Sequence, residues 1–147
     1  MKTTPFDEFL RGYMAALWWS STDCIPSDRS ESGNEEVVEL DQYEPSDAAI
    51  AKCTEDCRAF YDANEKNIDA AAQLYDLSRG DGADTGYDFA GHDFALTRNR
   101  HGAGFWDREE LKEDLEEESL GQRLTQAAHA AGEVHPYLGD DNLIHIG

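Results

Sequence analysis

Residues 45–79 read PSDAAIAKCTEDCRAFYDANEKNIDAAAQLYDLSR and set the architecture of this chain. The Pro-Ser-Asp start is typical of a helix N-terminus, because Ser caps free N–H groups and an acidic first turn complements the helix dipole. Apolar side chains then recur at an approximately helical period until the Gly-rich residues 80–82. A pattern of about 30 residues is long for one globular helix. We therefore expect a helical segment with a break near Asn64 or Asn67.

The outer face of this predicted segment is acidic. Successive acids on one helix face lie several ångströms apart, which is loosely comparable to the spacing of phosphates on DNA. A strongly negative surface attracts proteins whose own groove is positive, namely those that bind nucleic acid. The candidate partner-binding residues on this face are Glu55, Asp56, Asp62, Glu65 and Asp69.

A second acidic run lies in residues 109–131, which form another predicted helical region. Gly121 predicts a break within this region and Gly132 suits its C-terminal exit. The remaining candidate partner-binding residues are Glu113, Asp114, Glu116, Glu117 and Glu118.

The formal charge of −20 is concentrated in these two regions. Residues 31–90 carry −12 and residues 109–120 carry −6, whereas residues 91–108 between them carry +1. Solvated helix faces would explain such runs without a partner, and so would adaptation to high salt, which agrees with the presence of only four Lys. In either case, residues 91–108 differ from the two acidic regions, because they are almost neutral.

Length and composition exclude several classes of protein. A chain of 147 residues supports a single domain over 1–147, and 39% apolar residues are enough for a core. The sequence has no apolar run approaching the roughly 20 residues of a membrane span. Acids within residues 1–14 argue against a signal peptide, so we expect a cytoplasmic location and no membrane. Direct nucleic-acid binding through a basic surface is excluded, because phosphates would be repelled.

The other elements follow from local patterns. Thr4 as N-cap, Pro5 at the first position and Asp7 in the first turn predict a helix that ends near Ser20. We expect a mobile loop over 20–45. Two further patterns concern strands: EVHPYL and NLIHI flank GDD as a β-hairpin over 133–146, and HDFALT predicts a strand over 92–97. The predicted class is α+β, with helices packed on one face of a small antiparallel sheet.

The most distinctive stretch is GHDFALTRNRHGAGFWDR at residues 91–108. In a structural interpretation it forms a polar network that holds a loop, with Arg98 paired to Asp93 or Asp107 and Trp106 anchored in the core. In a second interpretation its mixed polar side chains build a ligand-binding or catalytic pocket. The residues of that pocket would be His92, Asp93, Arg98, Asn99, His101 and Asp107. A third interpretation is contact with a partner through Arg100, His101 and Trp106.

This stretch resembles a family of small acidic bacteriophage proteins that have no assigned function. The family pattern HDFxLTRNxHGAGFWDR matches at 92–94, 96–99 and 101–108, and further likeness lies in GYMAALWW, DCRAFYDANEKNI and YLGDDNLI. The resemblance thus covers most of the chain outside 20–45. It implies a phage origin and a host-takeover or anti-defence role, and it implies no reaction.

Three positions depart from the family pattern. Ala95 replaces a bulky aromatic residue, while Arg100 and Glu109 each replace Gly. If residue 100 is in a tight turn with positive φ, Arg is strained there.

The three cysteines carry no disulfide pattern. Cys53 and Cys57 lie one helical turn apart, and an odd count with Cys24 indicates reduced thiols. We interpret the pair as core thiols. Two metal alternatives are zinc bound by the pair with His101 or His129, and a divalent ion bound by His92, Asp93 and His101. We expect no cofactor, because phosphate-binding loops and nucleophile-elbow motifs are absent from the sequence.

These observations give three hypotheses for function. The leading one is a non-enzymatic phage inhibitor, a DNA mimic whose partner is a host protein with a basic nucleic-acid-binding groove, such as a CRISPR effector, restriction enzyme or repair enzyme. The second is a small enzyme or ligand-binding protein that uses the segment from His92 to Arg108. The third is a structural virion or accessory interaction protein. A homodimer paired through the helix predicted over 45–79 is also compatible with the sequence.

Overall fold

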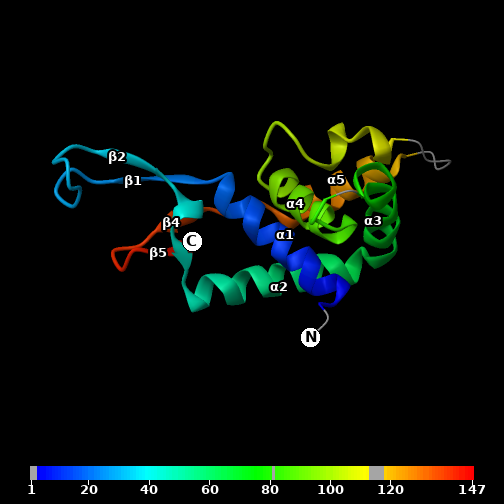
Figure 1. Cartoon of the computed structure of the whole chain (residues 1–147), viewed down its shortest axis with the longest axis horizontal. Coiled ribbons are helices and arrows are strands. Elements are labelled where there is room, and N and C mark those ends of the chain that lie inside the picture. Colours follow the sequence, from blue (N-terminus) through cyan, green and yellow to red (C-terminus); the bar gives the residue numbers. More distant parts are fainter. Residues whose placement is uncertain (1–2, 81, 113–117) are drawn as a thin grey trace.

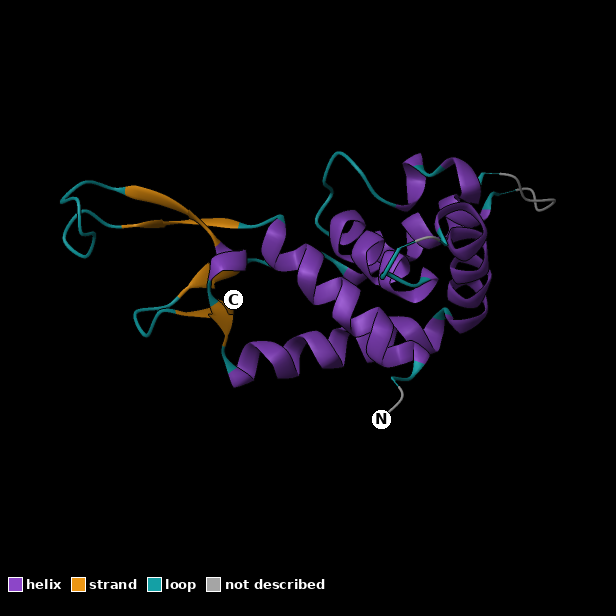
Figure 2. Ribbon diagram, in the orientation of Figure 1, coloured by secondary structure: helices purple, strands orange, loops and turns teal. Residues whose placement is uncertain are grey.

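The computed structural model describes residues 3–80, 82–112 and 118–147. Over these residues the chain is α+β, as predicted, with five α-helices and two small sheets of two and three strands. The helices pack around one another, and the strands lie together at one end of the molecule (Figures 1 and 2). Helices of the described residues lack the combination of length and apolar character that crossing a bilayer requires.

The first helix, α1 (Pro5–Trp19), begins as predicted. The Asp7 amide donates to the Thr4 hydroxyl at 3.1 Å, and the Thr4 amide donates to the Asp7 carboxylate at 3.1 Å. This reciprocal capping box satisfies amides that would otherwise lack partners.

The long acidic segment is two helices, α2 (Asp47–Ala63) and α3 (Glu65–Arg79), so the predicted break is confirmed at Asn64. Ser46 caps α2, since its hydroxyl accepts from the Ala49 amide at 3.1 Å. The inner faces of both helices enter the core, where the Phe60 and Phe94 rings stack with centroids 3.9 Å apart.

The predicted strand over 92–97 is wrong, because these residues belong to α4 (Gly86–Arg98). A capping box of Thr85 and Asp88 begins this helix. The helix packs against α1, α3 and α5 and is therefore buried on most of its surface. A helix surrounded in this way has no polar stripe, so its sequence lacks the amphipathic period that identifies surface helices.

Two short 3₁₀ turns follow α4, at Phe105–Asp107 and Glu109–Leu111. The last helix, α5 (Leu120–Ala131), is capped by Ser119, and Gly132 ends it with φ 81°. Of the region predicted as helical over 109–131, α5 is thus confirmed. The expected break precedes Leu120, and Gly121 lies inside the helix.

The 20–45 segment, for which we expect a mobile loop, contains a second hairpin. Strands β1 (Thr22–Ile25) and β2 (Glu36–Glu39) pair antiparallel, with Thr22 opposite Glu39, and they project away from the helices (Figure 1). A 3₁₀ turn at Leu40–Gln42 then leads toward α2. A polar hairpin that projects into solvent offers no apolar alternation by which to recognise it.

The C-terminal hairpin is confirmed as β4 (Pro136–Leu138) and β5 (Leu143–Ile146). The two-residue strand β3 (Glu44–Pro45) adds to β5 in parallel, so this sheet has the order β3-β5-β4 and is mixed. Ile144 is the fully buried contact of this sheet with the helical core. The sheets therefore lie at one end of the helices (Figure 1), where α2 packs against β5.

Candidate functional site

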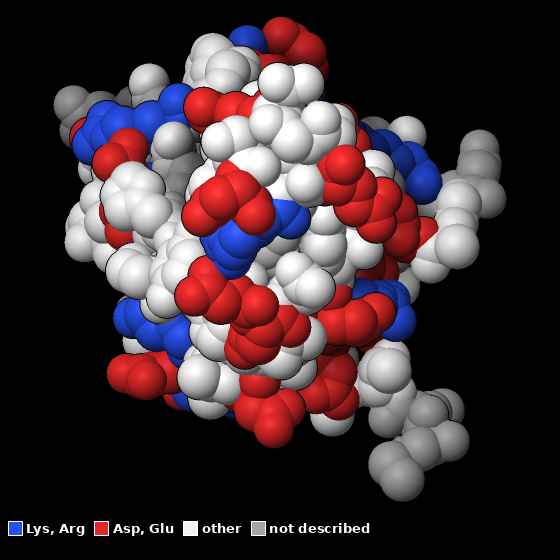
Figure 3. All heavy atoms as spheres, turned by 90° about the vertical axis from the view of Figure 1, so that its left-hand side faces the viewer, with Lys and Arg blue, Asp and Glu red and all other residues white. Residues whose placement is uncertain are grey.

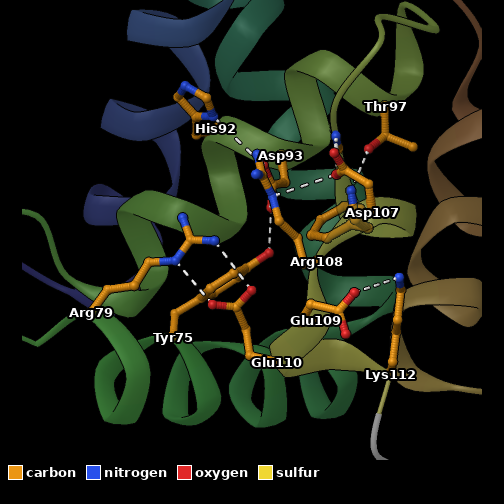
Figure 4. A network of polar contacts seen from close by, with 12 residues as sticks. Tyr75, Arg79, His92, Asp93, Thr97, Asp107, Arg108, Glu109, Glu110 and Lys112 are labelled. Atoms are coloured by element: carbon orange, nitrogen blue, oxygen red, sulfur yellow. Dashed lines mark hydrogen bonds and ion pairs between the residues drawn. The ribbon is translucent and has the colours of Figure 1, made fainter.

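The acidic centre of the motif is Asp93, which α4 holds in the interior with only 2% of its side chain exposed. Arg108 donates to both carboxylate oxygens, from Nη2 at 2.7 Å and from Nε at 3.0 Å, and the Tyr75 hydroxyl donates to the same carboxylate (Figure 4). The His92 ring lies 3.6 Å away. Asp93 is therefore saturated by partners of its own chain.

These contacts change the protonation of the three groups. Burial raises the pKa of Asp93, but the contacts of its carboxylate with His92, Arg108 and Tyr75 outweigh this effect, so the pKa lies below its ordinary value. Burial and the Asp93 charge raise the pKa of Tyr75, and the bond to Asp93 raises that of Arg108. Asp93 is thus a charged, fixed carboxylate at neutral pH and is unsuited to act as a general acid.

Arg98 does not pair with Asp93 or Asp107, and that prediction is wrong. It donates instead to the Asp56 carboxylate at 2.8 Å and to the Tyr13 hydroxyl at 2.9 Å. Two further donations, at 2.8 and 3.1 Å, reach the carbonyls of Gly132 and Ala131 at the end of α5. A cation here satisfies C-terminal carbonyls that lack helical partners. Arg98 thus joins α2, α4 and α5 and has a structural role.

The segment after α4 is held by short polar contacts. The Phe105 amide donates to the Thr97 hydroxyl at 3.0 Å, and the Gly104 amide donates to Asp107 at 3.0 Å. Phe105 is fully buried, whereas Trp106 is 47% exposed, so Phe105 anchors this segment and the prediction for Trp106 is wrong. The structural interpretation of the motif is confirmed for this network, with different partners.

The six candidate catalytic residues do not meet in one cavity. Asn99 and His101 line a cavity of about 230 Å³ beside Glu133, while His92 lines another of about 240 Å³. Asn99 also accepts from the Val134 amide at 2.9 Å. The set is thus divided between the middle of α4, where His92 lies, and its C-terminal end, which Asn99 and His101 follow.

The candidate acids on α2 and α3 are not equally available. Asp56 turns inward to Arg98 and Lys52, which corrects its placement on the outer face. Asp69 accepts from the Tyr87 hydroxyl at 2.7 Å, and exposed Asp62 pairs with Arg58. The acids that remain exposed without a described ion pair are Glu55, Glu65 and Glu118. Glu113, Asp114, Glu116 and Glu117 lie outside the described residues.

Further exposed acids lie outside the predicted candidate sets. From residue 30 to residue 51 the sequence contains no Lys or Arg, and this signal was available in the sequence. Figure 3 looks onto the strand end of the molecule and shows acidic groups over much of that face, with smaller basic patches between them. The exposed acids of this segment are Glu31, Glu35, Glu39, Asp41, Glu44 and Asp47, with Glu36 half-buried. We call these seven the strand-end acids.

The cysteine pair belongs to the core, as predicted. Cys53 and Cys57 are free thiols with no exposed surface, and burial raises the pKa of Cys53 to about 12 and that of Cys57 as well. Thiolates are the form that binds zinc. Within the described residues, no three His, Cys, Asp or Glu side chains come together as a possible metal site.

No protein-family model, no curated protein and no solved structure matches this chain.

Proposed function

We propose that this chain is a non-enzymatic acidic binding protein that occupies the basic nucleic-acid-binding groove of another protein. In this proposal it is phage-encoded and inhibits a host nucleic-acid-handling or defence enzyme in the host cytoplasm. The observation that carries the proposal is the set of strand-end acids, which lie on a stretch without Lys or Arg. The resemblance of residues 91–108 to phage proteins supports the origin.

The distribution of charge supports a role in binding. Among the strand-end acids, Glu39, Asp41 and Glu44 are exposed and have no described ion pair. Their charges therefore act on an approaching partner, and they raise the rate of encounter with a positive groove. From Asp47, α2 extends for about 25 Å at 1.5 Å per residue and carries Glu55 and Asp62 beyond them.

The geometry of the motif supports binding over catalysis. Asp93 and Arg98 are the most strongly buried charged groups of residues 91–108, and both are saturated by intramolecular partners. A general acid, base or oxyanion-stabilising residue must present a free atom to a substrate. These two residues are used to hold the fold, so the acidic surface is the better candidate for function.

The test uses the full chain as bait in host lysate at low salt, with elution by increasing salt and identification of the captured protein. We expect the captured protein to bind nucleic acid. Added duplex DNA or RNA should compete with the chain and prevent the capture. The affinity of the purified pair should fall at least tenfold between about 50 and 300 mM salt, because screening shortens the range of exposed charges.

Two triple variants with the same net charge distinguish an effect of the strand-end acids from an effect of net charge alone. We expect Glu39→Lys, Asp41→Lys and Glu44→Lys together to weaken binding at least tenfold. Asp84→Lys, Glu109→Lys and Glu133→Lys change the net charge equally at other exposed positions and should weaken it much less. Equal losses for both variants, or an affinity independent of salt, would contradict the proposal.

A further inference from the structure

A cavity of about 240 Å³ brings together three arginines of this very acidic chain. Arg11 comes from α1, Arg79 from the end of α3, and Arg108 from the segment after α4. His92 and Phe89 of α4 also line this cavity and are available for contact with a ligand. The cavity involves none of the strand-end acids, so its function is separate from the binding surface proposed above.

The three arginines share one geometry. Each donates from Nε and Nη2 to the two oxygens of a single carboxylate, side-on. The N···O distances are 2.8 and 2.6 Å for Arg11 with Asp88, 3.0 and 3.1 Å for Arg79 with Glu110, and 3.0 and 2.7 Å for Arg108 with Asp93. A two-point contact of this kind fixes the plane of the guanidinium group.

This geometry leaves one nitrogen of each arginine available. Within the described residues, the Nη1 atoms of Arg11, Arg79 and Arg108 have no hydrogen-bond partner, and each carries two N–H donors. Figure 4 shows one terminal nitrogen of Arg79 directed away from Glu110, toward the side on which His92 lies. Because the carboxylate contacts hold the three guanidinium groups in place, their Nη1 donors would bind a ligand with little further loss of side-chain freedom.

We propose that this cavity binds the phosphate group of a small phosphate monoester. A phosphate monoester presents three terminal oxygens, which suit three guanidinium groups, whereas a carboxylate presents two. His92 can donate or accept through its ring nitrogens. The volume exceeds that of a phosphate group, and the Phe89 ring provides an apolar wall for the esterified part.

Two acids also line the cavity and have different effects. Asp88 is neutralised by Arg11 and accepts from the Thr85 amide at 2.8 Å. Asp84 is exposed and has no described ion pair, so it repels an anion. The proposal therefore makes two opposite predictions: loss of Arg11 weakens binding, and loss of the Asp84 charge strengthens it.

Calorimetric titration of the full chain with inorganic phosphate, adenosine monophosphate and adenosine tests the ligand class. We expect saturable binding of adenosine monophosphate with a Kd below about 1 mM, and no binding of adenosine. Binding of inorganic phosphate as well would show that the oxyanion suffices, and binding of the monoester alone would show that the esterified part contributes. Both patterns support the proposal. It is overturned if neither phosphate compound binds at 10 mM, on the order of ten times that Kd, or if adenosine binds as well as its monophosphate.

Variants then test the site. Arg11 is 53% exposed, so Arg11→Gln should fold, and we expect it to bind the monophosphate at least fivefold more weakly. Asp84→Asn should bind at least twofold more tightly, and Arg29→Gln, at the strand end, should bind like the original chain. Thermal melting shows whether each variant is folded. Unchanged affinity in both Arg11→Gln and Asp84→Asn would overturn the proposal.

Discussion

Gly91 of α4 lies directly against the backbone of Phe9 in α1: a Cβ placed on Gly91 would be 1.9 Å from the Phe9 carbonyl oxygen. The contact is reciprocal, because a Cβ on Gly12 of α1 would be 2.0 Å from the Asp88 carbonyl oxygen of α4. The two helices therefore cross backbone against backbone. Asp93, two residues after Gly91, lies on another side of α4 and contacts Tyr75 of α3 and Arg108.

We expect Gly91→Ala to lower the free energy of unfolding by about 3 kcal/mol, because neither backbone can move without disturbing the core. Alanine is intrinsically the better helix former by roughly 1 kcal/mol. A decrease in the free energy of unfolding would therefore come from the steric clash and not from helix propensity. Urea denaturation followed by circular dichroism measures the effect. Gly102→Ala is the control, since a Cβ there meets nothing within 4 Å. A Gly91→Ala variant as stable as the original chain would contradict the close crossing.

Arg100 occupies a backbone position that favours glycine. Its φ is 57°, and the His101 amide donates to the Leu96 carbonyl while the Arg100 amide donates to the Thr97 carbonyl, both at 3.0 Å. These two bonds form a Schellman motif at the end of α4. The strain predicted for an arginine at a turn with positive φ is therefore present.

We expect Arg100→Gly to raise the free energy of unfolding by about 1 kcal/mol, because glycine adopts this conformation without a steric penalty. Arg100→Ala removes the same charge and keeps the Cβ, so it should give no such gain. Thermal melting of the two variants side by side is the measurement. If alanine stabilised as much as glycine, charge removal and not backbone strain would be the cause.

Local features of the fold were predictable from sequence, and contacts between distant segments were not. The caps at Thr4 and Ser46 and the break at Asn64 depend on neighbouring residues, and all three are confirmed. The strand predicted over 92–97 is part of α4, although the Thr85–Asp88 capping box of this helix is visible in the sequence. Because other helices surround α4, its sequence does not alternate between apolar and polar residues at a helical period, and the helix is not recognised from this pattern.

The candidate site was harder to predict for the same reason. Asp56 and Arg98 are 42 residues apart, and nothing in either neighbourhood indicates that one would turn inward to the other. The grouping of Arg11, Arg79 and Arg108 likewise exists only after three segments pack together. The strand-end acids are the exception, since the absence of Lys and Arg from residues 30–51 is visible in the sequence.

Removal of Arg98 should destabilise the fold. Its side chain is 4% exposed, and Arg98→Met would leave the Asp56 carboxylate and the last carbonyls of α5 without their donor. Breaking a buried ion pair costs about 3–5 kcal/mol, and we expect a loss in that range. Lys112→Met breaks an exposed pair with Glu109 and should cost about 0.5 kcal/mol. Urea denaturation distinguishes the two, and a similarly small loss for Arg98→Met would contradict the structural role.

Asp93 should make stability depend on acid pH. Its pKa in the folded chain lies below the unfolded value of 3.8, so its charge stabilises the fold fully above pH 3.8. That contribution is lost as the pH falls through the folded pKa. We expect Asp93→Asn to be about 3 kcal/mol less stable at pH 7, because the half-buried Arg108 loses its carboxylate, and the difference from the original chain should narrow below pH 3.8.

Urea denaturation at pH values from 7 to about 3 measures that difference. Glu55→Gln controls for the loss of one negative charge, since Glu55 is exposed and has no described ion pair, and its curve should stay close to that of the original chain. A constant difference between Asp93→Asn and the original chain across this range would mean that Asp93 does not change its protonation with folding. Its hydrogen bonds to Arg108 and Tyr75 would then stabilise the fold through geometry alone.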